Sequence, residues 1–120
     1  MSDLKNITRL IKALADEGRL RIVMLLVGKR KLCVCEIKEL IGLSQPTISS
    51  HLRLLENAGI LESTKEGLWV NYSLNSNTSE GFRDLINLVY SLLKEDKKLK
   101  NDIVKAGKVD RNKICKKISL

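Results

Sequence analysis

The fold is decided by the stretch Ile41-Gly42-Leu43-Ser44-Gln45-Pro46-Thr47-Ile48-Ser49-Ser50-His51-Leu52-Arg53, residues 41–53. Ser44 is a favourable N-cap for a helix, and Pro46 falls in its first turn, where a missing N–H costs little. A short helix over 34–41 is expected before this stretch, and Gly42 should end it. Two helices joined by so short a turn indicate a helix-turn-helix.

The flanking sequence adds helices on both sides and a hairpin. Apolar side chains at helical spacing predict a first helix with a stripe of Ile7, Leu10, Ile11 and Leu14. A second helix is expected between an Asp16 cap and Gly28, with an inner face of Leu20, Val23, Met24 and Val27, and a last helix from about Thr78 to the region 94–96. Residues 60–64 and 68–74 predict two strands joined by a turn at 65–67. The expected fold is mostly α with a β-hairpin, a winged helix-turn-helix of order α-α-α-α-β-β-α that dimerises through its terminal helices.

The helix that follows Ser44 is the candidate DNA reader. If Ile48, Leu52 and Leu55 face the core, short or forked polar side chains face outward, where they could reach base edges and phosphates. The predicted DNA-binding residues are Gln45, Thr47, Ser49, Ser50, His51 and Arg53, together with Lys65 at the hairpin turn. An ordinary solvated helix face would be equally polar. The lone His51 is more commonly a packed residue than a ligand, and it has no histidine partner for catalysis or zinc.

The terminal helices carry more apolar surface than a small core can bury, which is typical of an interface. The predicted dimer residues are Ile7, Leu10, Ile11, Leu14, Phe82, Leu85, Ile86, Val89, Leu92 and Leu93. A symmetric homodimer would place two reading helices about one turn of double-stranded DNA apart, on a near-palindromic operator.

Composition places the chain among single-domain proteins. Its 120 residues suit one domain, and no apolar run approaches the length of about 18–20 residues that spans a membrane. The N-terminus lacks an apolar signal region, so a cytoplasmic location with reduced cysteines is expected. The net charge of +8 is concentrated in residues 97–120, where nine basic and two acidic residues give +7. We therefore expect a DNA-binding and dimerisation domain over residues 1–96 and a basic, solvated tail over 97–120, which could instead add phosphate contacts.

Cys33-Val34-Cys35 lies directly before the helix-turn-helix. Thiolates bind soft ions and are open to oxidation, so a pair beside a DNA-reading helix favours a sensor of ions or oxidants. The plain alternative is two small buried apolar residues.

Several motifs, in the same order, resemble the ArsR/SmtB family of metal-responsive winged-helix repressors. They are Ala13-Leu14-Ala15-Asp16-Glu17-Gly18-Arg19-Leu20-Arg21-Ile22, Leu32-Cys33-Val34-Cys35-Glu36-Ile37, Ser44-Gln45-Pro46-Thr47-Ile48-Ser49-Ser50-His51-Leu52, Gly59-Ile60-Leu61 and Lys65-Glu66-Gly67-Leu68-Trp69-Val70-Asn71-Tyr72. Gly18 departs from the threonine often found there. The resemblance covers roughly residues 5–93 and implies a homodimer that represses its operator without metal and releases it when metal binds.

The Leu-Cys-Val-Cys-Glu pattern is similar to the arsenite- and antimonite-sensing branch, which implies As(III) or Sb(III) as inducer, no organic cofactor, and Cys33 and Cys35 as ligands. Zinc- and nickel-sensing members use histidines on the last helix, and residues 78–96 contain none. Some arsenic sensors place a third cysteine where this chain has Lys38. The third donor could be Cys115, from the same or the partner subunit, or an exogenous thiol, and Cys115 could equally be idle.

Spacing predicts how an ion would act. Successive helical residues turn by about 100°, so an intact helix cannot direct Cys33 and Cys35 at one ion. Binding is therefore expected to re-angle the first turn of the third helix and move the reading helix. The alternatives are a thiol redox sensor and a metal-independent DNA-binding regulator of the same fold. No phosphate loop or nucleophile–base pair supports an enzyme such as an arsenate reductase.

Overall fold

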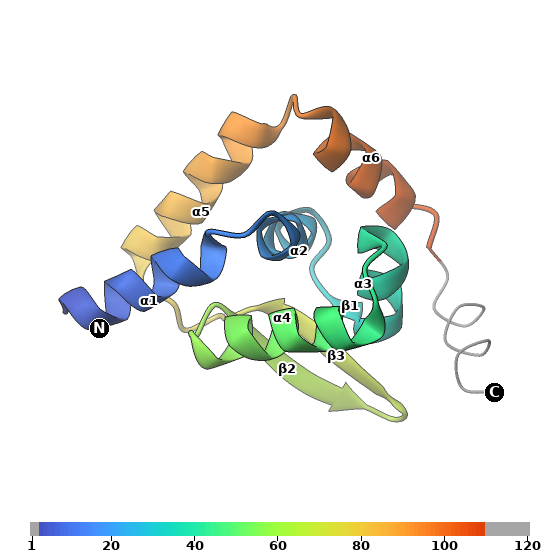
Figure 1. Cartoon of the computed structure of the whole chain (residues 1–120), viewed down its shortest axis with the longest axis horizontal. Helices are drawn as coiled ribbons and strands as arrows, with labels where there is room; N and C mark the ends of the chain where they lie inside the picture. Colours follow the sequence, from blue (N-terminus) through green and yellow to red (C-terminus); the bar gives the residue numbers. More distant parts are fainter. Residues whose placement is uncertain (1–2, 110–120) are drawn as a thin grey trace.

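The computed structural model describes residues 3–109 and confirms the winged helix-turn-helix (Figure 1). In chain order the elements are α1 (Leu4–Leu14), α2 (Glu17–Gly28), β1 (Leu32–Cys33), α3 (Val34–Ile41), α4 (Gln45–Asn57), β2 (Leu61–Glu66), β3 (Trp69–Leu74), α5 (Glu80–Leu93) and α6 (Lys97–Ala106). Two of them, β1 and α6, were not expected from the sequence.

The helix-turn-helix is formed by α3 and α4, with the bounds that their caps predict. Gly42 ends α3 with a left-handed φ of +81°, a conformation that glycine adopts without strain. The Ser44 hydroxyl accepts a hydrogen bond from the backbone N–H of Thr47, and Pro46 lies in the first turn of α4. Three residues of α4, Ile48, Leu52 and Leu55, are fully buried, as predicted.

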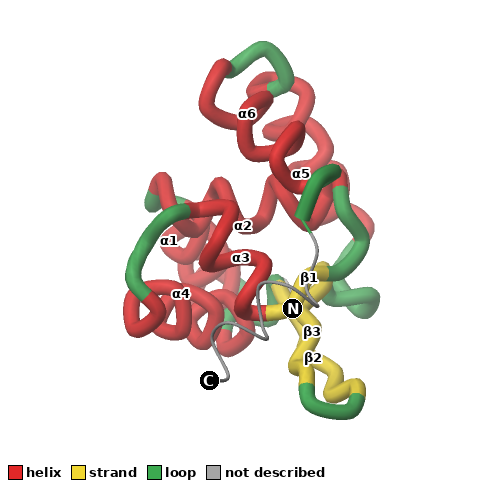
Figure 2. Tube along the Cα trace, turned by 90° about the vertical axis from the view of Figure 1, so that its right-hand side faces the viewer, coloured by secondary structure: helices red, strands yellow, loops and turns green. Residues whose placement is uncertain are grey.

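The wing is a three-stranded antiparallel sheet of order β1-β3-β2. Gly67, with a φ of +60°, turns the chain between β2 and β3, one or two residues later than expected. The hairpin extends away from the helices (Figure 2). The short strand β1 pairs with β3, with Leu32 opposite Tyr72 and Cys33 opposite Asn71. The wing is therefore joined directly to the start of α3.

The core surrounds α2. Its residues 22–26 are all buried, because α1, α3, α4, α5 and α6 contact it from different sides (Figure 1). The predicted one-sided face, with Leu20 and Val27 inward, was therefore too narrow: these two are only partly buried, while Ile22 and Leu25 are in the core. Where a helix is enclosed in this way, as α2 is over residues 22–26, its side chains are apolar on all sides rather than along one stripe.

The expectation of a solvated tail from residue 97 is wrong for its first part. Residues 97–106 form α6, which Asp96 caps by accepting a hydrogen bond from the backbone N–H of Leu99. This helix packs against α2 and α3 and buries Leu99 and Ala106. The division between a domain of residues 1–96 and a tail of residues 97–120 remains a prediction, and residues 110–120 lie outside the described part of the chain.

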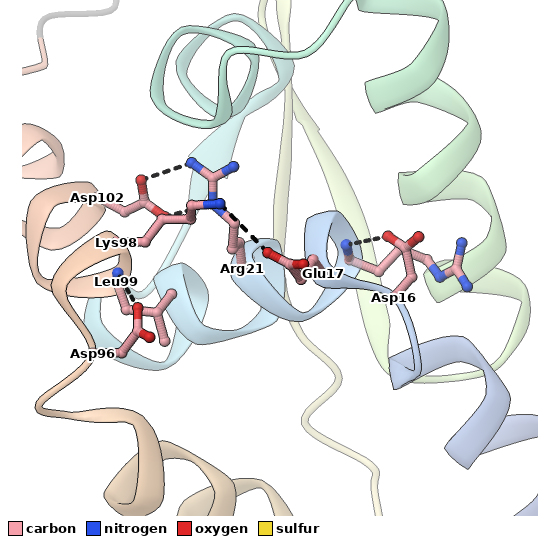
Figure 3. A network of polar contacts seen from close by, with 8 residues as sticks. Asp16, Glu17, Arg21, Asp96, Lys98, Leu99 and Asp102 are labelled. Carbon is pink, nitrogen blue, oxygen red and sulfur yellow. Dashed lines mark hydrogen bonds and ion pairs between the residues drawn. The ribbon is translucent and has the colours of Figure 1, made fainter.

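A buried ion pair holds α6 on α2. The Arg21 guanidinium donates two hydrogen bonds of 2.9 Å to the two carboxylate oxygens of Asp102, whose side chain is 2% exposed (Figure 3). These hydrogen bonds raise the pKa of Arg21 above its ordinary value, so the cation is retained. Lys29 Nζ also donates to the carbonyl oxygen of Ala106 at 3.0 Å. The outer Lys98–Glu17 pair, at 3.4 Å, is exposed.

Within residues 3–109, no helix has the length and apolar character needed to cross a membrane.

Candidate functional site

The outward face of α4 has the predicted polar character. Gln45, Thr47, Ser50 and Arg53 are exposed, and Ser49 is half-buried. Thr47, Ser50 and Arg53 point away from the buried Ile48–Leu52–Leu55 stripe, whereas Gln45 is exposed in the first turn of α4, in line with that stripe. The Thr47 hydroxyl accepts a 2.9 Å hydrogen bond from the Ser44 hydroxyl and can still donate to a nucleic acid. A DNA-reading role for these five residues stays a prediction.

The side chain of His51 is turned toward α2, the packed placement that is more common for a lone histidine. Its side chain is 15% exposed and its Nε2 is 3.6 Å from Oδ2 of Asp16, the residue that caps α2. A Cβ on Gly18 would come within 3.0 Å of the same nitrogen. The glycine that departs from the usual threonine therefore makes room for the imidazole. Because His51 points toward α2, its placement does not support the predicted DNA contact.

Replacing Asp16 with alanine is expected to lower the free energy of unfolding by about 1 kcal/mol near neutral pH, because α2 loses its N-cap. The hydrogen bond from the backbone N–H of Arg19 holds the pKa of Asp16 below its ordinary value of 3.8. A depressed folded-state pKa gives stability that is present above the ordinary pKa and is lost as the pH falls through the lowered value.

The stability difference should therefore be constant down to about pH 5 and shrink below about pH 4. Urea denaturation in a His51→Gln background measures it without a contribution from the histidine. A difference that persists unchanged at the lowest pH would contradict the capping role of the carboxylate.

Lys65 is exposed on β2, opposite Val70 of β3. It lies within the strand rather than at the turn, which is formed by Gly67 and Leu68. The next residue of β2, Glu66, forms an ion pair with Lys31, which directly precedes β1. Lys65 thus remains available to a phosphate, and its DNA contact stays a prediction.

The cysteine pair lies at the junction of β1 and α3. Cys33 is the last residue of β1 and the N-cap of α3, and only 1% of it is exposed. Cys35 is half-buried in the first turn of α3. Cys33 and Glu36 form a capping box: the Glu36 carboxylate accepts a 2.9 Å hydrogen bond from the backbone N–H of Cys33, and the Cys33 sulfur takes the position of the usual hydroxyl.

The sequence-based expectation that Cys33 and Cys35 lie on one intact helix is wrong. Cys33 has extended backbone angles, φ −85° and ψ 167°, so the two cysteines do not share one helix. The rotation of about 100° per helical residue therefore does not apply between them, and it does not prevent their two sulfurs from facing one ion. Residues 3–109 contain no group of three or more His, Cys, Asp or Glu side chains able to hold a metal ion. The candidate third donor, Cys115, lies outside the described residues.

Sequence reasoning missed Asn71. It is directly opposite Cys33 in the sheet, and 1% of it is exposed. Within the described part of the chain, neither its Nδ2 nor its Oδ1 has a hydrogen-bond partner. The pattern gave no signal for it, because the residue lies among apolar and aromatic neighbours in an ordinary strand.

The terminal helices carry exposed apolar stripes, but only some of the predicted interface residues belong to them. Leu4, Ile7 and Ile11 are exposed along α1, as are Leu85, Leu88 and Leu92 along α5. Each set has the spacing i, i+3, i+7, so each forms one stripe. The predicted interface residues Leu10, Phe82 and Ile86 are instead buried in the subunit's own core, and Leu14, Val89 and Leu93 are partly buried against it.

Comparisons with known proteins agree with this architecture. Residues 16–63 match the family described as "Bacterial regulatory protein, arsR family". The chain is 49% identical over 67 residues to the arsenical resistance operon repressor of Escherichia coli, covering 56% of this chain and 57% of that protein. It is 43% identical over 70 residues to a cadmium resistance transcriptional regulatory protein of Staphylococcus aureus, covering 58% of each. The chain thus spans somewhat over half the length of these two curated relatives.

One solved structure covers more of the fold. It is the homodimeric winged helix-turn-helix DNA-binding domain of a possible ArsR-family transcriptional regulator from Mycobacterium bovis. The two chains are 30% identical with a TM-score of 0.65, and the match covers 78% of this chain and 83% of the other. The capped helix-turn-helix, the paired wing and these likenesses lead to one conclusion: the chain belongs to the ArsR family of transcriptional regulators.

Proposed function

We propose that this protein is a homodimeric transcriptional repressor that binds double-stranded operator DNA and releases it when arsenite or antimonite binds its cysteine thiolates. The arsenical-resistance and cadmium-resistance regulators among its relatives support an inducer that is a soft, thiophilic ion. The two sulfurs of Cys33 and Cys35 are the donors that such ions prefer.

The position of Cys33 carries the proposal. The residue ends β1, which pairs with wing strand β3, and it caps α3, which packs against α4. Any displacement of its sulfur therefore acts on both DNA-facing elements. When bound, the ion would supply bonds to sulfur that draw the two thiolates together. The Cys33 sulfur would then leave the capping box, and the first turn of α3 would lose a support of about 1 kcal/mol.

The thiols of Cys33 and Cys35 are of the type that a soft ion binds, but they supply only two donors, and trivalent arsenic prefers three. We propose Cys115 as the third. The C-terminal end of α6 supports this, because Lys29 holds the Ala106 carbonyl and lies three residues before β1. Cys115 is nine positions after Ala106, enough chain to span up to about 30 Å.

DNA recognition is assigned to the exposed polar face of α4 and to the wing. The proposed contacts are made by Gln45, Thr47, Ser49, Ser50 and Arg53 of α4 and by Lys65 of β2. Side chains of this kind bind base edges and phosphates in the major groove.

Dimerisation is assigned to the stripes on α1 and α5. Leu88 is 56% exposed and lies in the middle of the α5 stripe. Replacing it with glutamate is expected to convert the dimer into monomers, because a charge would be buried in an apolar interface. Analytical ultracentrifugation should show the mass falling by half, with operator affinity weakened at least tenfold.

The matched control is Asn87→Glu, which adds the same charge one residue away at an exposed polar position of α5. It should remain dimeric. Equal dimer stability in the Leu88→Glu and Asn87→Glu proteins would move the interface away from this stripe.

The function is tested on an operator selected from random duplexes by the protein itself. The preformed complex is titrated with arsenite, antimonite, cadmium and zinc, for the wild type and for Cys115→Ser. Arsenite and antimonite should release the duplex at lower concentration than zinc, and loss of Cys115 should raise the arsenite concentration required. Release by peroxide alone, reversed by dithiothreitol, would favour the redox alternative, and no release by any agent would favour a metal-independent regulator.

A further inference from the structure

Asn71 is a buried polar residue without a described partner. Its carboxamide can make up to four hydrogen bonds, yet within residues 3–109 neither Nδ2 nor Oδ1 makes one. A buried amide left unpaired destabilises a fold, and nearly all such groups in proteins are satisfied. A leucine of similar size would fill the same place without this penalty. The asparagine therefore needs a reason that the described contacts do not provide.

The sheet register places this amide beside the cysteine pair. Asn71 is directly opposite Cys33 across the β1–β3 ladder, and the next residues along, Tyr72 and Leu32, are opposite each other. Side chains alternate between the faces of a sheet, and opposite residues share a face. Leu32 is in the core, so Cys33 and Asn71 share the other face. Opposite Cβ atoms lie about 5 Å apart, which brings the amide within reach of the sulfur.

We infer that Asn71 is a positioning residue for the ion site, with its side-chain NH₂ donating a hydrogen bond to the Cys33 sulfur when that sulfur is an ion-bound thiolate. This inference rests on the proposed function. A ligating thiolate carries negative charge and accepts hydrogen bonds more strongly than a thiol. Partners of this kind orient a ligand and commonly change metal affinity by about tenfold or more. The same bond would hold the displaced sulfur against wing strand β3 and so link the ion to the wing.

The decisive variant is Asn71→Leu, because the fold and the ion site are expected to respond in opposite directions. Without the ion, removal of the orphan amide should keep or raise Tm, by up to about 5 °C. Operator affinity without the ion should not change. Cadmium affinity, measured by competition with a chelator and followed by the thiolate-to-cadmium charge-transfer absorption, should fall about tenfold. The arsenite concentration that releases the operator should rise by a similar factor.

Two further variants distinguish the loss of the hydrogen-bond donor from a general effect on the sheet. Asn71→Ser retains a donor, so its cadmium affinity should lie between those of the wild type and Asn71→Leu. Thr64→Val is the matched control, since Thr64 is the neighbour of Asn71 on its other side in β2 and is exposed. It should leave cadmium affinity unchanged.

The outcomes separate this inference from the function on which it rests. If arsenite releases the operator equally well from the wild type and Asn71→Leu, and cadmium affinity is unchanged, the inference is overturned and the function stands. If arsenite does not release the operator from the wild type, the function fails; a tenfold loss of cadmium affinity in Asn71→Leu would still support the hydrogen bond. A loss equal in Thr64→Val and Asn71→Leu would also overturn the inference, because it would show a general effect of the sheet.

Discussion

The Cys33→Ser protein is expected to bind operator DNA with wild-type affinity and to show no release by arsenite. Serine is nearly the same size and is a preferred N-cap, so α3 should keep its capping box with Glu36. A neutral hydroxyl is a poor ligand for a soft ion, so the ion loses a donor. Fluorescence anisotropy of a labelled operator would measure both properties in one titration. The arsenite concentration for release should rise by at least about a hundredfold.

Cys35→Ser should behave in the same way, because the pair acts as one site. The control is Glu39→Ala, a change at an exposed position of α3 that carries no sulfur. It should respond to arsenite as the wild type does. Continued release by both single serine variants would exclude the Cys33–Cys35 pair as the ion site.

Arg21→Ala is expected to give the largest loss of stability among substitutions of charged residues, about 3 kcal/mol. The substitution leaves the Asp102 carboxylate, which is 1% exposed, without its cation and without two hydrogen bonds. A small domain has a total stability of only about 5–15 kcal/mol, so this is a substantial share. Urea denaturation followed by circular dichroism would measure it, at one fixed protein concentration because a dimer's stability depends on concentration.

Two controls define the cause. The double variant Arg21→Met, Asp102→Leu removes both charges and should recover most of the lost stability, since apolar residues of similar size can replace a buried pair. Lys98→Ala breaks only the exposed pair with Glu17 and should change stability by less than about 0.5 kcal/mol. If Arg21→Ala were as stable as Lys98→Ala, the ion pair would not be what docks α6 on α2.

The elements that the sequence predicted best are those whose ends are marked by capping or helix-terminating residues. The bounds of α3 and α4 follow from Gly42, Ser44 and Pro46, each of which acts within its own turn. The strand β1 has no such signal, because two residues have no periodicity and become a strand only by pairing with β3. It could be recognised only once the hairpin was placed in three dimensions.

Helix α6 was missed for a different reason. Its buried stripe is formed by Leu99, Asp102 and Ala106, so a charged residue occupies the centre of the inward face. In the sequence this segment resembles a solvated basic run. The partner that makes Asp102 an interior residue is Arg21, 81 positions earlier. Only the tertiary contact shows that the charge is neutralised.

The candidate site was likewise only partly visible. The spacing of Cys33 and Cys35 pointed to soft-ion chemistry, and the polar face of α4 to DNA. Neither pattern shows that Cys33 ends a strand, that His51 faces Asp16, or that Asn71 lies opposite the first cysteine. These features depend on register and packing between distant segments.

The most direct test of the account follows the anisotropy of a labelled operator while arsenite is added to its complex with the wild-type protein at a protein concentration well above the dissociation constant. The coupling of the Cys33–Cys35 site to α4 and the wing predicts that anisotropy falls to the value of free duplex when one ion has been added per subunit. A complex that remains intact after a large excess of arsenite has bound would contradict it.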